Sequence, residues 1–436
     1  MNLSEHISAV AYIALLVLIW IPYGLRRKRR TERSLAVLEE ARNAGLHEPP
    51  SLHPLIDKSV CLGCGTCVPA CPEGEVLGLV SGKVELINPA NCIGHGACKD
   101  ACPQDAITLV LGTETRGVDI PALKPNFETN VPGLFVCGEL GGMGLIRNAI
   151  EQGRQAIEAV RALDGIGKGD RLDVVIVGAG PAGFSASLAA KQHGLRFATI
   201  EQETLGGTVS HYPRGKIVMT APALLPLHGR VTFRETTKER LLEFWQKVEQ
   251  ETGLEIRYEE RVGGITPNAD GFDVETSAGR YRTRAVLLAI GRRGTPRKLE
   301  VPGEEGEKVV YRLIDPEQYR GQRVLVIGGG DSALEAATTL AEQLMTEVTL
   351  AYRGDAFSRA KPKNRERVEA AVADGRLRLL LRSSVAEITP AEVRMQTESG
   401  PQSFENDVVI VCAGGILPTG FLRSIGIAIE TKYGTA

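Results

Sequence analysis

Two cysteine-rich runs between Cys61 and Pro103 constrain this chain more than any other part of its sequence. The first run reads CLGCGTCVPACP, and the second reads CIGHGACKDACP. Each follows the spacing C-x2-C-x2-C-x3-C-P of iron–sulfur sites, except that His95 replaces one cysteine in the second run. Three thiolates on one glycine-rich loop hold three corners of a cluster, so the other run must supply the fourth. The candidate metal ligands are Cys61, Cys64, Cys67, Cys71, Cys92, His95, Cys98 and Cys102.

A structural zinc site and disulfides of a secreted domain are the alternative interpretations of these cysteines. Zinc sites rarely place four such ligands within eleven residues, twice, with a proline after each run, so the spacing favours iron–sulfur clusters. The remaining cysteines, Cys137 and Cys412, each lie in an apolar run and are expected to be packing residues. The sequence therefore leaves no cysteine framework for a secreted fold and predicts a reducing compartment.

From Lys58 to Val110 the sequence resembles the bacterial two-cluster ferredoxins, in which the fourth cysteine of each run binds the other cluster. The resemblance implies a first 4Fe-4S cluster on Cys61, Cys64, Cys67 and Cys102. It implies a second cluster on Cys71, Cys92 and Cys98, with His95 or an open site at the fourth iron. Both a 3Fe-4S cluster and a His-ligated cluster are consistent with that second set.

The N-terminal segment carries an uncharged run from Ile7 to Leu25, followed by five cations at Arg26 to Arg30. As a helix the run would be about 28 Å long, close to the thickness of a bilayer core. Trp20 and Tyr23 lie near one end, and charge that follows the apolar core argues against a cleaved signal peptide. The sequence predicts a single-pass inner-membrane anchor with its N-terminus outside and the catalytic domains in the cytoplasm.

A dinucleotide-binding pattern spans residues 173–201. An apolar β-branched run leads into G-A-G-P-A-G, a helical pattern follows, and a second strand ends on an acidic residue. The first glycine permits a tight turn, the second lets a pyrophosphate approach, and the third lets the helix pack on the strand. The acidic residue, Glu201, is placed to accept hydrogen bonds from ribose hydroxyls. The residues predicted to bind this nucleotide are Gly178, Gly180, Pro181, Ala182, Gly183 and Glu201.

The residues after Glu201 resemble the thioredoxin-reductase-like flavoproteins, which carry a Gly-Gly segment and a Tyr-Pro turn. Residues 212–220 are most similar to the branch of bacillithiol disulfide reductases. The resemblance implies that the first nucleotide is FAD and adds Gly206, Gly207 and Thr208 to its site. It also implies an α/β fold of two Rossmann-like domains, beside a small α+β ferredoxin domain and the N-terminal transmembrane helix. Members of this family often form homodimers, which we expect here as well.

The segment that closes the FAD domain in this family normally lies near the C-terminus, but the similar stretch here precedes the first glycine pattern. It runs through residues 129–153, with Glu139 where the family has Asp. We interpret it as a circular permutation in which residues 114–163 have moved to the front and residues 164–170 link the old termini. The alternative is a duplicated remnant without a flavin contact. The resemblance implies FAD contacts at Gly138, Glu139 and Ala149.

A second glycine pattern, RVLVIGGGDSA, occupies residues 323–333, again between a strand and a helix. The next strand ends on Tyr352-Arg353 instead of an acid, and an arginine accommodates the 2′-phosphate of NADP. Arg353, with Arg359 and Lys361 nearby, therefore favours NADPH over NADH, although a solvated basic face would give the same pattern. The residues predicted to bind this nucleotide are Gly328, Gly330, Asp331, Ala333, Arg353 and Arg359.

The redox thiols of both related branches are missing from this chain. Thioredoxin reductases carry a C-x-x-C dithiol after a Val-x-Tyr, but here Tyr311 is followed by Arg312-Leu-Ile-Asp315. The bacillithiol branch has a cysteine in its first glycine turn, where this chain has Ala182. The clusters are therefore the expected route for electrons.

We predict an FAD-dependent NAD(P)H oxidoreductase that passes electrons between NAD(P)H, FAD and the clusters, in either direction, with an unknown protein or small-molecule acceptor. No acid–base catalytic residue is required. The alternatives are a reductase of low-molecular-weight disulfides, a redox sensor, and a subunit of a membrane redox complex. The net charge of −2 gives no indication of a nucleic-acid partner.

These motifs predict successive domains along the chain. They are an anchor with basic flank at 1–30, a linker helix and spacer at 31–57, the dicluster domain at 58–111, the FAD-closing segment and linker at 112–170, the FAD domain at 171–295, the NAD(P)H domain at 296–418, and a tail at 419–436 that returns to the FAD domain.

Overall fold

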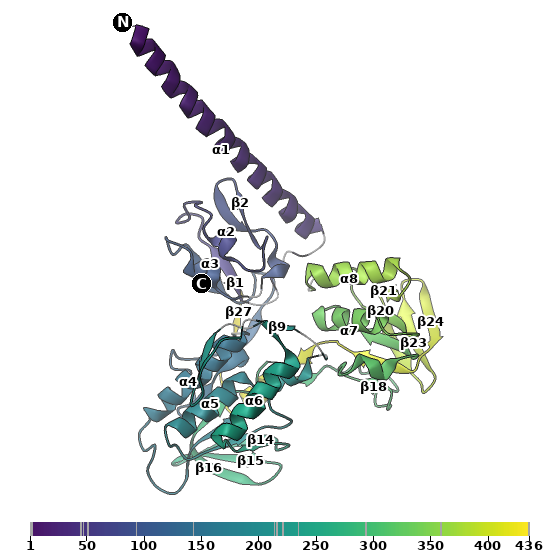
Figure 1. The fold of residues 1–436 in the computed structure, drawn as a ribbon. Helices are drawn as coiled ribbons and strands as arrows, with labels where there is room; N and C mark the ends of the chain where they lie inside the picture. Colours follow the sequence, from purple (N-terminus) through teal and green to yellow (C-terminus); the bar gives the residue numbers. More distant parts are fainter. Residues whose placement is uncertain are drawn as a thin grey trace. The chain divides into compact units, whose positions relative to one another are not determined.

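The computed structural model describes residues 3–43, 46, 48–49, 52–92, 94–142, 144–212, 214, 217–219, 222–233, 235–292, 294–357 and 360–434. These residues form two compact units (Figure 1). The first unit extends to Thr115 and includes Gly434, and the second runs from Arg116 to Tyr433.

Helix α1 (Leu3–Asn43) is a single element that contains both the apolar run and the basic flank (Figure 1). Its second half is charged and packs on the rest of the first unit. Ser34 and Ala41 are buried there, and Arg33 pairs with Glu75. Within the described parts of the chain, no helix is both long and apolar enough to cross a membrane. The predictions of a transmembrane anchor and an inner-membrane location are therefore wrong, because a membrane span must have both properties. Nothing among the residues that the structure describes supports the predicted membrane partner.

The rest of the first unit is small and built from short elements. The strands β1 and β4 pair antiparallel, as do β2 and β3. Their bounds, with those of the helices, are β1 (His53–Ile56), α2 (Cys67–Ala70), β2 (Leu77–Val80), β3 (Lys83–Leu86), η1 (Pro89–Asn91), α3 (Ala97–Asp100) and β4 (Ile107–Val110). Cysteines of both runs pack with Val76, Leu77 and Ile107 in its core.

The first half of the second unit is organised around a mostly parallel sheet with the order β13-β8-β7-β16-β15-β14. The strands are β7 (Leu172–Val177), β8 (Phe197–Ile200), β13 (Ile256–Arg257), β14 (Val262–Asn268), β15 (Gly271–Thr276) and β16 (Arg280–Leu288). Strand β6 (Leu134–Val136) precedes all of these in the chain and pairs in parallel with the C-terminal half of β16. Strand β7 is buried along almost its whole length, which explains its continuous apolar run.

Helices cover this sheet. Helix α5 (Pro181–Gln192) lies between α4 (Ile146–Arg161) and α6 (Lys238–Thr252), and the rings of Phe184 and Trp245 approach to 6.3 Å (Figure 1). The surrounding short elements are β5 (Val118–Pro121), η2 (Gly138–Gly141), η3 (Gly207–His211), β9 (Ile217–Met219), β10 (Ala223–Leu225), β11 (Gly229–Val231) and β12 (Glu235–Thr237). Strand β5 pairs antiparallel with β27 (Ile429–Lys432), so the segment before the first glycine pattern meets the end of the chain.

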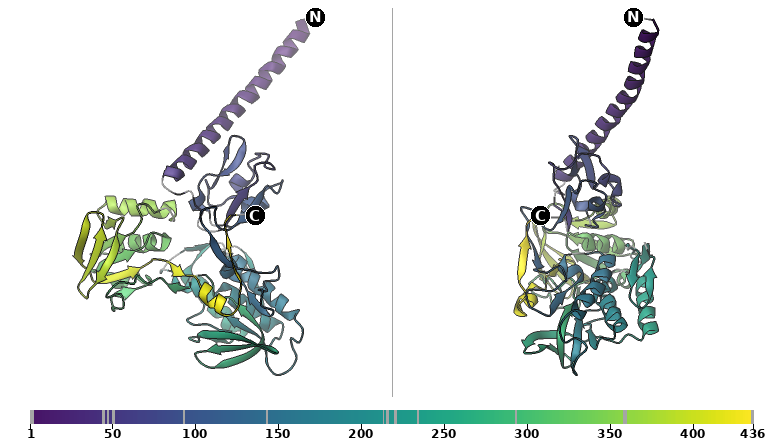
Figure 2. Two further views of the ribbon diagram at one scale, coloured as in Figure 1. Left: turned by 180° about the vertical axis from the view of Figure 1, so that it is seen from behind. Right: turned by 90° about the vertical axis from the view of Figure 1, so that its left-hand side faces the viewer.

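The second half carries another parallel sheet, with the order β18-β25-β19-β20-β21. Its elements are β18 (Val309–Val310), η4 (Pro316–Tyr319), β19 (Arg323–Ile327), α7 (Asp331–Ala341), β20 (Glu347–Ala351), α8 (Pro362–Ala373), β21 (Leu377–Leu380) and β25 (Val408–Val411). An antiparallel sheet of β22 (Ser384–Ile388), β23 (Glu392–Thr397) and β24 (Gly400–Glu405) packs beside it (Figure 2). Strands β17 (Thr295–Pro296) and β26 (Gly415–Ile416) pair where the chain leaves and re-enters the first half, followed by α9 (Thr419–Ser424).

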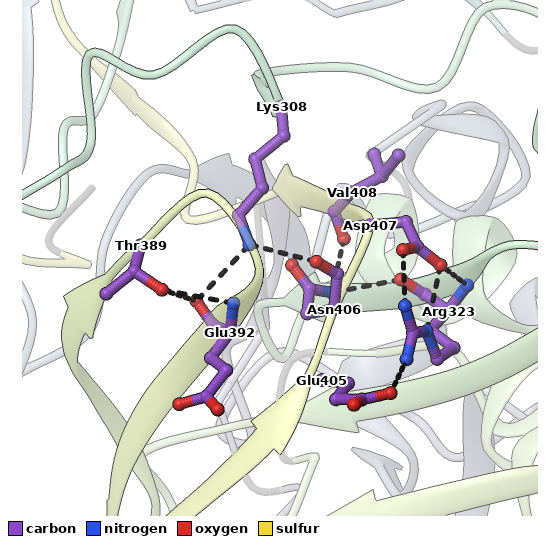
Figure 3. Close-up of polar contacts among 8 residues, drawn as sticks. All are labelled: Lys308, Arg323, Thr389, Glu392, Glu405, Asn406, Asp407 and Val408. Carbon is purple, nitrogen blue, oxygen red and sulfur yellow. Dashed lines mark hydrogen bonds and ion pairs between the residues drawn. The ribbon is translucent and has the colours of Figure 1, made fainter.

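A polar cluster fastens the beginnings of β19 and β25 (Figure 3). Asp407 accepts hydrogen bonds from the Arg323 backbone N–H at 2.8 Å and from its Nη2 at 2.7 Å, and these bonds lower the pKa of Asp407 to about 2. Asn406 donates to the Arg323 carbonyl at 3.0 Å, and Lys308 donates to the Asn406 carbonyl at 3.0 Å. Because the cluster lies at the amino ends of these strands, it stabilises the sheet from the side opposite the glycine turn.

Candidate cofactor-binding sites

The predicted cluster ligands line two separate cavities of the first unit. Three side chains of one run and one of the other surround each cavity. One cavity is lined by Cys61, Cys64, Cys67 and Cys102, and the other by Cys71, Cys92, His95 and Cys98. No three described His, Cys, Asp or Glu side chains form a group that could hold a single metal ion. Four ligands spread around a cavity are the arrangement that a multi-atom cluster needs.

The first cavity is the more exposed of the two at its Cys64 corner. Cys64 is exposed, and the Thr66 hydroxyl, 3.4 Å from its Sγ, lowers the pKa of the thiol. Cys61 and Cys67 are buried, and burial raises the pKa of Cys67 to about 11. The Gly63 N–H donates to Cys61 Sγ at 3.4 Å, a contact of the kind that tunes cluster potentials. Because iron stabilises thiolates directly, the raised pKa does not prevent ligation.

The second cavity is lined by three cysteines and one histidine. Burial raises the pKa of Cys92 to about 11, and it also raises that of Cys98. His95 is half-buried, and burial lowers its pKa against the opposing charge of Glu73. The His95 Nδ1 accepts a hydrogen bond from the Ala97 N–H at 3.2 Å, while Nε2 lies 3.8 Å from Cys71 Sγ.

The first glycine turn follows β7 and leads into α5. Gly178 has φ +103°, and a Cβ atom there would lie 2.6 Å from the Ala289 carbonyl oxygen. A Cβ atom at Gly183 would lie 1.8 Å from the Gly178 carbonyl oxygen, so only glycine lets α5 pack on the strand end. Pro181 opens α5, after Gly180 at its N-cap, and Ala182 is buried in its first turn. The positive end of the α5 dipole therefore points to the place where a pyrophosphate would bind.

Glu201, at the end of β8, supports this turn. Its Oε2 accepts a hydrogen bond from the Ala179 N–H at 2.7 Å, and its Oε1 accepts one from the Glu203 N–H at 2.9 Å. Burial raises the pKa of Glu201. Its two bonds leave further lone pairs for the ribose hydroxyls that the sequence predicts as partners.

The Gly-Gly segment of η3 crosses close to the same turn. A Cβ atom at Gly207 would lie 3.0 Å from Gly180 Cα. The Gly206 N–H donates to the Ala179 carbonyl at 3.0 Å. Thr208 follows on η3, so the structure brings Gly206, Gly207 and Thr208 beside the first glycine turn.

The segment that precedes the first glycine pattern packs on the first turn of α5. A Cβ atom at Gly138 would lie 2.9 Å from Ala182 Cβ, and one at Gly153 would lie 2.0 Å from the Ala182 carbonyl oxygen. The Gly138 N–H donates to Gln152 Oε1 at 2.8 Å, which joins η2 to α4. Ala149 is buried in the same region.

Glu139 lies close to Gly291, which follows the C-terminal end of β16. A Cβ atom added at Gly291 would lie 3.7 Å from Glu139 Oε2. Burial lowers the pKa of the neighbouring Arg292, and the charge of Glu139 opposes that effect. The structure therefore brings Gly138, Glu139 and Ala149 close to the residues of the first glycine turn.

The second glycine turn follows β19. Gly328 has φ +147°, and a Cβ atom there would lie 2.4 Å from the Cys412 carbonyl oxygen. Gly330 is the N-cap of α7, and Ala333 is fully buried in its first turn. Asp331 accepts from the Lys361 N–H at 2.8 Å and from Asn364 Nδ2 at 2.7 Å, which ties α7 to the start of α8.

The predicted phosphate-binding arginines follow β20. Arg353 is exposed directly after this strand, whereas Arg359 lies outside the described residues. Tyr352, which the sequence did not indicate, covers the turn, because a Cβ atom at Gly329 would lie 2.3 Å from its ring. That ring stacks on Phe357 at 5.6 Å.

A charged network joins Arg312, in the second half of the second unit, to His211 and Glu203 in its first half. Arg312 contacts His211 Nδ1, and its Nη2 lies 3.4 Å from Glu203 Oε1. His211 Nε2 lies 2.7 Å from Glu203 Oε2, and Arg214 lies 3.5 Å from Asp315. The motifs of the sequence predict no such network at this position. The charges of Arg312 and Asp315 are the sequence signal from which it could have been expected.

A further cavity of the second unit lies away from these turns. It is lined by Leu172, Phe197 and Arg280, among others, at the beginnings of β7, β8 and β16. Nucleotides bind at the carboxyl ends of the strands in parallel sheets, so this cavity is not a nucleotide site of that kind.

Comparison with known proteins establishes the class of this chain. Residues 175–435 match the family model of pyridine nucleotide-disulphide oxidoreductases, and residues 53–103 match that of 4Fe-4S dicluster domains. The chain belongs to the pyridine nucleotide-disulphide oxidoreductase family.

Individual relatives agree with this assignment. A ferredoxin–NADP reductase of Ignicoccus hospitalis is 30% identical over 264 residues, which cover 60% of this chain and 83% of that protein. The bacilliredoxin reductase Bdr of Bacillus subtilis is 29% identical over 267 residues, covering 60% and 82%. The bacillithiol disulfide reductase Bdr from Staphylococcus aureus has a TM-score of 0.54 at 25% identity, covering 60% of this chain and 82% of that one.

The chain is therefore an FAD-dependent NAD(P)H oxidoreductase with an iron–sulfur domain, which confirms the enzyme class expected from the sequence.

Proposed function

We propose that this chain oxidises NADPH and transfers the electrons to its own iron–sulfur domain, and from there to an acceptor outside the chain. The observation that carries the proposal is the combination of two cavities, each lined by four candidate cluster ligands, with a flavoprotein that lacks both expected redox thiols. The Ignicoccus relative is named for ferredoxin and NADP, and this chain carries a ferredoxin-like domain of its own. Electron transfer in the reverse direction, from a reduced donor to NADP, would use the same nucleotide sites and clusters.

The residues of the two glycine turns would hold the nucleotides. When bound, FAD supplies the conversion between hydride transfer and single-electron transfer, and the clusters supply single-electron carriers. Gly178, Gly180 and the α5 N-terminus would bind the FAD pyrophosphate, with Glu201 towards the ribose. Gly328 and Gly330 would bind the pyrophosphate of NADPH. From residue 58 onwards, the proposed domain limits are those given by the sequence motifs.

The preference for NADPH rests on Arg353. It is exposed at the end of β20, the position from which a side chain reaches the 2′ position of the adenosine ribose. A carboxylate at this place would repel the 2′-phosphate, and the chain has none at residues 352–354.

We further propose that residues 114–163 complete the FAD domain as a circularly permuted segment. Strand β6 joins the main sheet beside β16, and β5 pairs with β27 near the C-terminus. The family match begins only at residue 175, while roughly a sixth of each relative remains unmatched. A segment that has moved to the front of the chain would produce this pattern of matches.

Anaerobic stopped-flow mixing of the purified holoprotein with NADPH, and separately with NADH, tests the proposed function. We expect the flavin absorbance to bleach first and cluster reduction to follow, faster with NADPH. Fast flavin bleaching with clusters that stay oxidised would contradict the proposal. Turnover of bacillithiol disulfide that survives removal of the clusters would favour the function named for the Bdr relatives instead.

A further inference from the structure

The four side chains around the second cavity are not equivalent. Cys71, Cys92 and Cys98 contribute sulfur atoms, whereas His95 contributes a ring that is already held on one side. Its Nδ1 accepts a hydrogen bond from the Ala97 backbone N–H at 3.2 Å. Its other nitrogen, Nε2, lies 3.8 Å from Cys71 Sγ, within hydrogen-bond range for sulfur.

The hydrogen bond to Nδ1 determines where the proton of the neutral ring is. A neutral imidazole has one N–H and one bare nitrogen. Because Nδ1 accepts from a backbone N–H, Nδ1 is the bare nitrogen and Nε2 carries the proton. A histidine that binds a metal shows the opposite arrangement, in which the bare nitrogen faces the metal and the other nitrogen donates to a carbonyl or carboxylate. His95 is therefore arranged as a donor towards the cavity.

We propose that His95 donates a hydrogen bond from Nε2 to the Cys71 sulfur and is not an iron ligand. The second cluster then has only Cys71, Cys92 and Cys98 as protein ligands and is of the three-iron type. This inference rests on the proposed function, because it requires clusters in both cavities. An N–H donor to a ligand sulfur stabilises the reduced, more negative cluster, so His95 raises the reduction potential of this cluster.

The experiment uses the anaerobically purified holoprotein, analysed for iron and by EPR and Mössbauer spectroscopy. We expect about seven irons per chain, and in the oxidised state the EPR signal of one three-iron cluster. His95→Cys should remove that signal and raise the content to about eight irons per chain. His95→Ala should keep the signal but lower the potential of that cluster, while His95→Gln, which retains an N–H donor, should lower it less. The potential of the first cluster is the internal control and should not change.

The outcomes separate the two proposals. About eight irons per chain in the wild type, without a three-iron signal and with an imidazole ligand that disappears in His95→Ala, would overturn the role of His95 and leave the proposed function standing. An unchanged potential of the second cluster in His95→Ala would also overturn it. A purified protein that holds flavin but no iron–sulfur cluster would overturn both proposals.

Discussion

Replacing Gly153 with alanine is the most direct test of whether the segment before the first glycine pattern belongs to the FAD site. Gly153 lies on α4 where this helix crosses the first turn of α5. A Cβ atom there would lie 2.0 Å from the Ala182 carbonyl oxygen and 3.1 Å from the Ala186 backbone nitrogen. These neighbours are backbone atoms of a buried helix, so no flexible side chain can move aside.

The size of the effect follows from this geometry. Helix α4 must move away by about 1 Å before the closest contact reaches 3.0 Å. Overpacking of this kind costs about 1–3 kcal/mol. If the strain appears in FAD binding, because Ala182 belongs to the predicted site, the affinity should fall about 5- to 150-fold. The purified variant should then contain less than one FAD per chain.

The assay measures bound FAD after purification and its dissociation constant by fluorescence titration of the deflavinated protein. Gly420→Ala is the matched control, because Gly420 is also helical but is exposed and has no atom within 4 Å of an added Cβ. We expect this control to bind FAD like the wild type. A Gly153→Ala protein with wild-type FAD content and affinity would refute the proposed role of α4.

Three further predictions concern other parts of the molecule. Asp407→Asn should lower the free energy of unfolding by about 0.5–1 kcal/mol at pH 7, since the pair with Arg323 is partly exposed. Because the folded-state pKa is lowered to about 2, this difference should be full above pH 4–5 and vanish as the pH falls towards 2 in urea titrations, with no change in NADPH affinity. Arg353→Glu should raise KM for NADPH by about tenfold or more and affect NADH much less, and equal effects on both would contradict the phosphate role. Cys102→Ala should remove the spectrum of the first cluster and Cys71→Ala that of the second, and loss of the opposite cluster would refute the exchange of cysteines between the runs.

The local elements of both nucleotide sites were predictable because each depends on a short contiguous pattern. Gly178 and Gly328 must be glycine to adopt positive φ beside a neighbouring strand, and that requirement is visible as a fixed spacing after an apolar run. The cluster ligands could be predicted for the same reason, because the spacing of the cysteine runs follows from the shape of a cluster. An uncharged run of sufficient length was not enough to predict an anchor, because spanning a bilayer requires a helix that is both long and apolar enough, and no helix among the described residues is.

Side-chain contacts between distant segments were not predictable. Asp331 reads as a nucleotide-binding residue from its place in the second pattern, but in the structure it accepts from the Lys361 N–H and from Asn364, about thirty residues away. Tyr352 covers Gly329 only because β20 brings it beside the turn. Such contacts depend on which strands are neighbours. Local patterns in a single sequence do not show this before the fold is known.

The network at Arg312 connects the missing redox thiols with the proposed role of the iron–sulfur clusters. Arg312 occupies the position for which the sequence resemblance implies a dithiol, and in the structure it is paired with Glu203 and hydrogen-bonded to His211. A guanidinium cannot be oxidised or reduced under these conditions, and these contacts join the two halves of the second unit. The proposed function therefore assigns the electrons of the flavin to the iron–sulfur domain. The cluster ligands in the first unit are the redox-active groups that the same chain provides.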